Sequence, residues 1–137
     1  MTLIQKKTKY IRGVQPTSTK TKFHKANGMV FIQSTQNNTI VTLTDLRGNA
    51  KSWASGGSCG FNGSRRSTTY AAKAAAEKVA KDAIAMGLRF ITVQMKGLRR
   101  GKKKSAVKGL AGLKILQIHD TTSTPHNGCR APKKRRT

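Results

Sequence analysis

A glycine-rich loop followed by two arginines is the stretch of this sequence best suited to bind an anion. Glycines are frequent in residues 56–63, and Arg65 and Arg66 follow at the expected start of a helix. Glycine lets a nucleic-acid backbone approach closely, and the guanidinium fork holds phosphate oxygens in pairs. The loop has neither the Gly-Lys-Ser/Thr ending of a P-loop nor the spacing of a dinucleotide fingerprint. We expect Gly56, Gly57, Arg65 and Arg66 to bind backbone phosphate; a plain flexible loop is the alternative.

The charge of the whole chain points to the same class of ligand. The 137 residues include 28 lysines and arginines but four acidic residues, for a net charge of +24. Such a field opposes folding unless a polyanion neutralises it. Residues 28–95 have a net charge of only +5, so the other +19 lies in two terminal segments and one internal stretch. RNA would neutralise these segments through its phosphates, and an anionic membrane surface is the alternative.

Three basic segments are therefore predicted to contact RNA. Residues 1–27 form an N-terminal arm, for which an organelle transit peptide is the alternative. Residues 96–104 are expected to form a loop, and residues 121–137 a tail that two prolines stiffen. For the last four cations of the tail, the alternative to RNA binding is a nuclear localisation signal. The predicted RNA-contacting cations are Lys6, Lys7, Lys9 and Arg12 in the arm, Lys96, Arg99, Arg100, Lys102, Lys103 and Lys104 in the loop, and Lys133, Lys134, Arg135 and Arg136 in the tail.

The acidic residues do not suggest an enzyme. Asp45 lies in an expected turn, Glu77 and Asp82 lie on the exposed face of a helix among lysines, and Asp120 follows a strand. No two of them converge by sequence position, so we predict a protein without catalysis, with a metal-dependent nuclease as the alternative.

The cysteines and histidines are too sparse for a convincing metal site. His126 and Cys129 have a spacing that could supply two zinc ligands, but structural zinc sites usually combine two such pairs. We therefore expect reduced thiols at Cys59 and Cys129, with no metal and no cofactor. No apolar run approaches the length of about 18 residues that a membrane span needs, and we expect no membrane partner.

The hydrophobic pattern predicts an α/β domain over residues 28–120, which must position these groups. Short strands are predicted at 29–32, 39–44 and 49–55, joined by tight turns into an antiparallel meander. A helix begins at Ser67 or Thr68 and ends at Gly87, with Ala72, Ala76, Val79, Ala83 and Met86 as its buried stripe. A strand at 88–95, a short helix at 105–111 and a strand at 114–119 complete a mixed five-stranded sheet with two helices.

The C-terminal sequence is the most specific segment of the chain. Its Pro-His-Asn-Gly-Cys-Arg run at 125–130, followed by lysines and arginines, closely resembles the C-terminus of the bacterial-type S-eleven family of small ribosomal subunit proteins. The resemblance extends through Asn-Asn-Thr-Ile-Val-Thr at 37–42 and through residues 56–72. It covers about residues 29–95 and 120–137.

The resemblance implies a fold, a location and partners. The fold would be ribonuclease-H-like without catalysis, and the protein would lie on the platform of the small subunit, bound to its rRNA near the messenger exit path and supporting assembly and translation. Its neighbours would be small-subunit proteins six, eighteen, seven and twenty-one, with messenger RNA nearby. The matching RNA contacts would be Asn37, Asn38, Gly56, Gly57, Arg65, Arg66, His126, Asn127, Arg130 and the terminal cations.

One region departs from the family pattern. Where the family usually has a Pro/Gly-rich loop and then an acid, residues 98–104 read Leu-Arg-Arg-Gly-Lys-Lys-Lys. We take this divergence to favour an organellar ribosome, mitochondrial before plastid, with a bacterial ribosome as the alternative. Separately, Asn127 precedes Gly128, a pair in which the glycine amide can attack the asparagine side chain and leave isoaspartate. An ordinary asparagine in a turn is the alternative there.

Overall fold

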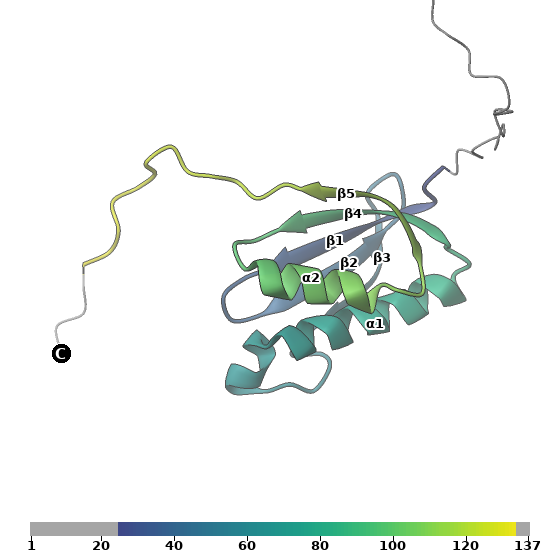
Figure 1. The fold of residues 1–137 in the computed structure, drawn as a ribbon, viewed down its shortest axis with the longest axis horizontal. Helices are drawn as coiled ribbons and strands as arrows, with labels where there is room; N and C mark the ends of the chain where they lie inside the picture. The colour runs from purple at the N-terminus through teal and green to yellow at the C-terminus, as the bar shows by residue number, and fades with distance from the viewer. Residues whose placement is uncertain (1–24, 134–137) are drawn as a thin grey trace, which may run out of the picture.

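The computed structural model describes residues 25–133, and these form a single mixed sheet with two helices on one of its faces (Figure 1). Lys6, Lys7, Lys9, Arg12, Lys134, Arg135 and Arg136 lie outside the described residues. The elements in chain order are β1 (Gly28–Ser34), β2 (Thr39–Thr44), β3 (Ala50–Ser55), the 3-10 helix η1 (Gly63–Ser67), α1 (Thr69–Ala85), β4 (Phe90–Lys96), α2 (Arg100–Gly109) and β5 (Lys114–Asp120).

The strands are ordered β3-β2-β1-β4-β5, with the first strand in the centre. β1, β2 and β3 pair antiparallel, whereas β1 pairs parallel with β4 and β4 pairs parallel with β5. Parallel pairing needs a crossover, and α1 and α2 provide the two crossovers here. The predicted α/β class, ribonuclease-H-like mixed five-stranded sheet and two helices are confirmed.

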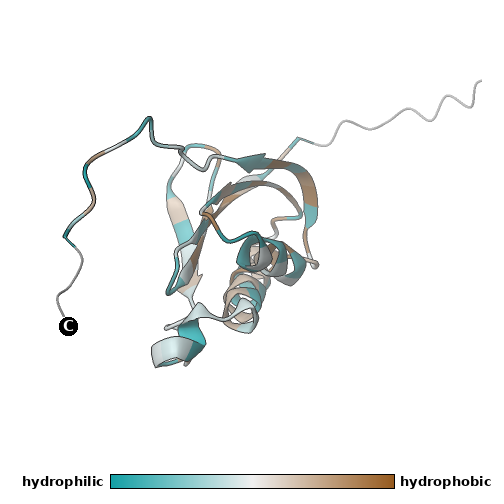
Figure 2. Cartoon of the chain, turned by 60° about the vertical axis from the view of Figure 1, so that its left-hand side comes forward, coloured by the Kyte–Doolittle hydropathy of each residue, from teal (hydrophilic) through white to brown (hydrophobic). Residues whose placement is uncertain are grey.

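The core lies between the sheet and the helices, and small residues keep these layers close. Valine, leucine and isoleucine side chains from alternate positions of the strands, such as Val30 and Val41, are fully buried against alanines of α1. Figure 2 shows the apolar residues concentrated in the strands, whereas the C-terminal segment is largely hydrophilic. The predicted stripe of α1 is confirmed at Ala72, Ala76, Val79 and Ala83 but is wrong at Met86, which is half exposed because the helix ends there.

The ends of α1 follow the sequence prediction. The hydroxyl of Thr68 accepts a hydrogen bond from the backbone N–H of Ala71, and this side chain caps the helix. Gly87 adopts a φ of +78°, the left-handed conformation that favours glycine just beyond a helix. On the exposed face of the helix, Glu77 pairs with Lys73, one turn earlier, at 3.3 Å.

The second helix begins earlier than predicted. Residues 100–104 were expected in a basic loop, but α2 starts at Arg100 and ends at Gly109. Lysine and arginine have good helix propensity, and the pattern of buried positions at Lys102, Lys103 and Ala106 continues the helical spacing toward the N-terminus. Two of the predicted loop cations are therefore inside the fold.

Lys103 fastens the root of the C-terminal tail. Its ammonium group is 2.6 Å from the carboxylate of Asp120, the last residue of β5, and holds the pKa of that carboxyl at about 2. The backbone N–H of Thr122 also donates to Asp120, and the hydroxyl of Thr122 contacts the backbone of Gly97. The tail therefore leaves the domain from a fixed point beside the β4–α2 connection.

This topology gives the molecule two unlike ends. Because β1, β4 and β5 are parallel, their carboxyl ends lie together, and both helices begin at that same end. The tail leaves there too, whereas residues 25–27 enter β1 from the opposite end (Figure 1). We call the first of these the loop end, because the β1–β2 turn, residues 56–63 and the start of α2 all lie there.

We predict that Gly109→Ala destabilises the domain by about 1–3 kcal/mol, because the added methyl group overpacks the contact between the helices. A Cβ at Gly109 would lie 2.6 Å from the backbone oxygen of Lys73 and 2.8 Å from Cβ of Ala76, and neither atom can move freely. The matched control is Gly101→Ala in the same helix, where the nearest atom is a methyl carbon at 3.7 Å. That variant should gain about 0.4–1 kcal/mol from the lower entropy of its unfolded chain. Urea unfolding of both variants measures the difference; equal stabilities would contradict the prediction.

We also predict an acid-dependent loss of stability that depends on Asp120. Its pKa is about 2 in the folded protein and 3.8 ordinarily, so its stabilising effect is complete above about pH 4 and is lost as the pH falls toward 2. The melting temperature of the wild type should fall through this range more steeply than that of Asp120→Asn. Parallel curves for the two proteins would show that the Lys103–Asp120 pair does not couple to folding.

Candidate nucleic-acid interface

The structure brings four of the predicted RNA-contacting residues together at the loop end. A Cβ at Gly56 would lie 3.0 Å from Oδ1 of Asn38 and 3.2 Å from the backbone oxygen of Arg66. At Gly57 the nearest atom would be Cδ of Arg66, at 3.5 Å. Asn38 and Arg66, which are distant in sequence, therefore meet around Gly56, which is itself buried, whereas Asn38 and Gly57 are half-buried and Arg66 is exposed. A larger residue at Gly56 would press on the β1–β2 turn and on η1, whereas a Cβ at Gly57 would make only ordinary van der Waals contact.

The glycine-rich loop is held by its own hydrogen bonds. The backbone N–H of Ser55 donates to the hydroxyl of Ser58 at 2.8 Å, and the N–H of Ser58 donates to the hydroxyl of Ser55 at 3.2 Å. The rings of Phe61 and Tyr70 meet edge to face with their centroids 5.7 Å apart, which joins the loop to α1. The loop then delivers Arg65 and Arg66, both exposed, on η1.

Asn38 is half-buried and forms hydrogen bonds that close the β1–β2 turn. Its Oδ1 accepts a hydrogen bond from the backbone N–H of Thr39 at 2.9 Å, while the hydroxyl of Thr35 donates to its backbone oxygen at 3.0 Å. These bonds close the β1–β2 turn and leave the neighbouring Asn37 exposed at its tip. The turn is thus a rigid platform for Asn37 rather than a loose connection.

The start of α2 adds cations to this surface. Arg99 and Arg100 are exposed, and no side chain caps the helix. The first backbone N–H groups of a helix lack partners within it and carry a partial positive charge, so an uncapped start next to arginines favours an anion. A hollow of about 430 Å³ between the two helix starts is lined by Ser67, Thr69, Arg99, Arg100, Gly101 and Lys102.

Lys102 ties α2 to the β1–β2 turn instead of facing solvent. Its ammonium group donates to the backbone oxygens of Thr35 at 3.0 Å and of Gln36 at 2.7 Å, and only 2% of the residue is exposed. Burial lowers the pKa of Lys102, and the nearby Arg99 lowers it further. Without an acidic partner, the cation is held by carbonyl dipoles. It therefore positions the turn that presents Asn37 and Asn38.

The prediction that Lys102 and Lys103 contact RNA is corrected accordingly. Both residues are more than nine-tenths buried, and their ammonium groups are bonded to Thr35, Gln36 and Asp120 within the protein. Lys96 and Lys104 are exposed, as their predicted role requires. The helical spacing from Ala106 back to Lys102 is the sequence signal that could have separated the inward lysines from the outward ones.

The tail residues lie apart from this surface. His126, Asn127, Arg130 and Lys133 are exposed in a segment without helix or strand. Asn127 and Gly128 have φ values of +63° and +66°, a tight left-handed turn that both residues tolerate. Whether Asn127 forms isoaspartate stays a prediction, and peptide mass spectrometry of assembled particles tests it.

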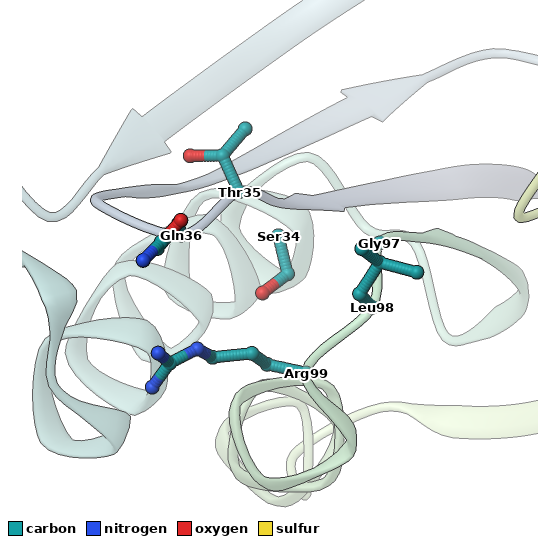
Figure 3. Close-up of a pocket in the computed structure, with 6 residues that line it drawn as sticks. All are labelled: Ser34, Thr35, Gln36, Gly97, Leu98 and Arg99. Carbon is teal, nitrogen blue, oxygen red and sulfur yellow. The ribbon is translucent and has the colours of Figure 1, made fainter. Parts of the chain in front are cut away.

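Sequence reasoning missed a second hollow at the loop end. It has a volume of about 340 Å³ and is lined by Ser34, Thr35, Gln36, Gly97, Leu98 and Arg99 (Figure 3). Gly97 has a φ of +136°, and a Cβ there would overlap the backbone oxygen of Ser34, so β1 and the β4–α2 connection meet closely. In the sequence, the position of Gly97 between a strand and a basic run is compatible with such a close contact, but it is equally compatible with an ordinary turn.

Negative charge is weak at the loop end. Asp45 lies beyond β2 at the opposite end, where hydrogen bonds from the side chain and the backbone of Asn49 lower its pKa. Asp82 accepts a hydrogen bond from Ser52, and Asp120 is neutralised by Lys103. The field at the loop end is therefore set by arginines and lysines.

The described part of the chain holds neither a cluster suited to a metal ion nor a helix suited to a membrane. Within residues 25–133, no three His, Cys, Asp or Glu side chains gather where they could hold a metal ion. In the same range, no helix has the length and apolar character needed to cross a membrane. Cys59 packs partly buried against the core, and Cys129 is exposed in the tail.

Comparison with known proteins identifies the family. The model of the family described as ribosomal protein S11 matches residues 28–136. A protein of Marchantia polymorpha named small ribosomal subunit protein uS11m is 59% identical over 105 residues, which cover 75% of this chain and 83% of that protein. A protein of Mycoplasmoides gallisepticum named small ribosomal subunit protein uS11 is 50% identical over 113 residues, covering 81% and 93%.

A third relative extends the range of sources. The protein of Phaeodactylum tricornutum named small ribosomal subunit protein uS11c is 52% identical over 112 residues, which cover 80% of this chain and 85% of that protein. The family resemblance seen in the tail, the Asn-Asn turn and the glycine-rich loop is thereby confirmed over most of the chain. The chain belongs to the ribosomal protein S11 family and is a structural protein of the small ribosomal subunit.

Proposed function

We propose that this protein binds small-subunit rRNA with its loop end and its tail, without catalysing a reaction. The observation that carries the proposal is the convergence of Asn38, Gly57 and the exposed Arg66 around the buried Gly56, next to the uncapped start of α2. Rigid backbone with glycines allows a close approach of an RNA backbone, and the arginines supply paired phosphate contacts. The buried Lys102 keeps the turn and the helix in register, so the surface has a fixed shape for docking on folded RNA.

The tail would extend the same contact. It leaves the domain at the loop end, and its predicted contacts are His126, Asn127, Arg130 and the cations from Lys133 onward. An extended segment of 17 residues reaches up to roughly 55 Å, far beyond the domain. The domain would fix the position on the rRNA, while the tail would add phosphate neutralisation along it.

The arm is proposed to contact RNA from the other side. Lys6, Lys7, Lys9 and Arg12 precede a strand that begins at the end opposite the loop end. Arm and tail would therefore reach different parts of the rRNA, with the domain between them.

We further propose the location that the family resemblance implies. The protein would lie on the platform near the messenger exit path, with small-subunit proteins six, eighteen, seven and twenty-one as neighbours and messenger RNA nearby, and would support assembly and translation. The source would be a mitochondrial ribosome before a plastid one; the suffix m in the name of the Marchantia relative supports this order. Sedimentation with small subunits from purified organelles tests the compartment.

We predict that Arg65→Gln combined with Arg66→Gln weakens binding to a small-subunit rRNA transcript. Both side chains are exposed at the loop end. Removing two phosphate contacts should reduce the slope of log affinity against log salt by about 2. Filter binding over a series of salt concentrations measures this slope.

The matched control for that variant is Lys78→Gln combined with Lys81→Gln. It removes the same charge from exposed positions on α1 outside the proposed surface, so its slope should stay close to that of the wild type. Equal losses in the two double variants would mean that net charge alone drives binding, and the loop-end interface would be wrong.

Deleting residues 132–137 should weaken rRNA binding while leaving the fold intact. The deletion removes four cations, which should lower the salt slope by about 3. The melting temperature should be nearly unchanged, since the core lies within residues 30–113. An unchanged salt slope would contradict a role of these cations on RNA.

A further inference from the structure

The hydroxyl group of Ser34 is unusual in being both buried and unpartnered. Ser34 is the last residue of β1, only 4% of it is exposed, and its Oγ has no hydrogen-bond partner among the described residues. A buried hydroxyl without a partner is costly, and most such groups in proteins are bonded. Ser34 lines the hollow of about 340 Å³ next to the start of α2, so a bound molecule could supply the missing partner.

The other walls of this hollow offer further polar groups. Figure 3 shows the Ser34 hydroxyl, the side-chain amide of Gln36 and the guanidinium group of Arg99 around the same space. Leu98, on the opposite wall, is 87% exposed, which is unusual for a leucine. Such apolar side chains can insert between bases, and guanidinium planes can stack on them.

The shape of the hollow favours a base over a phosphate. A phosphate belongs to the continuous backbone of the RNA and is reached most easily by groups that project from the protein, such as Arg65 and Arg66. A base projects sideways from the backbone and can enter a recess. The volume lies at the lower end of the range for small-ligand pockets. At its wall, a hydroxyl and an amide can each donate and accept hydrogen bonds, as the edge of a base requires.

We propose that the hollow between the end of β1 and the start of α2 binds one unpaired RNA base, with Ser34 and Gln36 bonding its edge and Arg99 and Leu98 contacting its faces. The proposal rests on the proposed rRNA function and adds a base-reading site to a surface otherwise built for phosphate. It gives the β4–α2 connection a role in selecting which strand end or loop of the rRNA can dock.

The test compares Ser34→Ala with Thr39→Val in the full chain. Thr39 faces Ser34 across the β1–β2 pair and also carries a buried hydroxyl without a partner, but it does not line the hollow. Because each substitution removes an unsatisfied group, both variants should fold and melt no lower than the wild type. The probes are short single-stranded homopolymers of A, C, G and U, and an abasic ribose-phosphate strand of equal length.

We expect the wild type to bind at least one homopolymer more tightly than the abasic strand. Ser34→Ala should lose about three- to tenfold in affinity for that homopolymer and nothing for the abasic strand, as the loss of one hydrogen bond predicts. Thr39→Val should bind both probes like the wild type.

Three results would overturn the proposal. If the wild type binds the abasic strand as tightly as every homopolymer, the hollow takes no base, although the proposed rRNA function survives. The same conclusion follows if Ser34→Ala binds all probes like the wild type. If the wild type binds neither homopolymers, abasic strand nor a small-subunit rRNA transcript, the proposed function itself fails.

Discussion

The parallel pairing of β1 with β4 and of β4 with β5 is the constraint on which the rest of this structure depends. It forces both connections to return along the sheet, and both helices do so on the same face. As a result, three strand ends, two helix starts and the root of the tail lie at one end of the domain. Residues of the β1–β2 turn, of the glycine-rich loop with η1, and of the start of α2 thereby lie on one surface, and no single stretch needs to contain a complete site.

Part of the large positive charge of the chain is bonded within the fold, because two lysines of α2 have their partners inside the protein. Lys102 is stabilised by two carbonyl oxygens, and Lys103 by the carboxylate of Asp120. These contacts cost desolvation of the ammonium groups, and backbone and side-chain partners offset that cost. Both lysines also act on the interface indirectly, since Lys102 fixes the β1–β2 turn and Lys103 fixes the origin of the tail. Two lysines that were predicted to bind RNA therefore stabilise the shape of the proposed RNA-binding surface instead.

Much of this architecture was predictable from the sequence because the signals were local. Alternating apolar residues marked the strands, and Thr68 and Gly87 marked the ends of α1. The start of α2 was not predictable in the same way, because a run of lysines and arginines is equally typical of a solvated loop. The spacing of Lys102, Lys103 and Ala106 is compatible with a helix, but the packing of α2 on α1 at Gly109 decides which of these lysines point inward. Likewise, the hollow at Ser34 depends on two segments more than 60 residues apart, and no local pattern encodes their contact.

The basic sequence of residues 98–104 has a physical explanation in this geometry. An acid at the start of a helix stabilises the helix dipole, but it would also place negative charge beside the proposed RNA surface. Here the first turn of α2 carries no acid, and the helix is anchored instead by Lys102 and Lys103, whose charges are taken up inside the protein. This arrangement leaves the partial positive charge of the helix start and the guanidinium groups of Arg99 and Arg100 uncompensated toward solvent. The lack of an acid in the first turn of α2 thus favours an anionic partner at the point where the helix, the turn and the root of the tail meet.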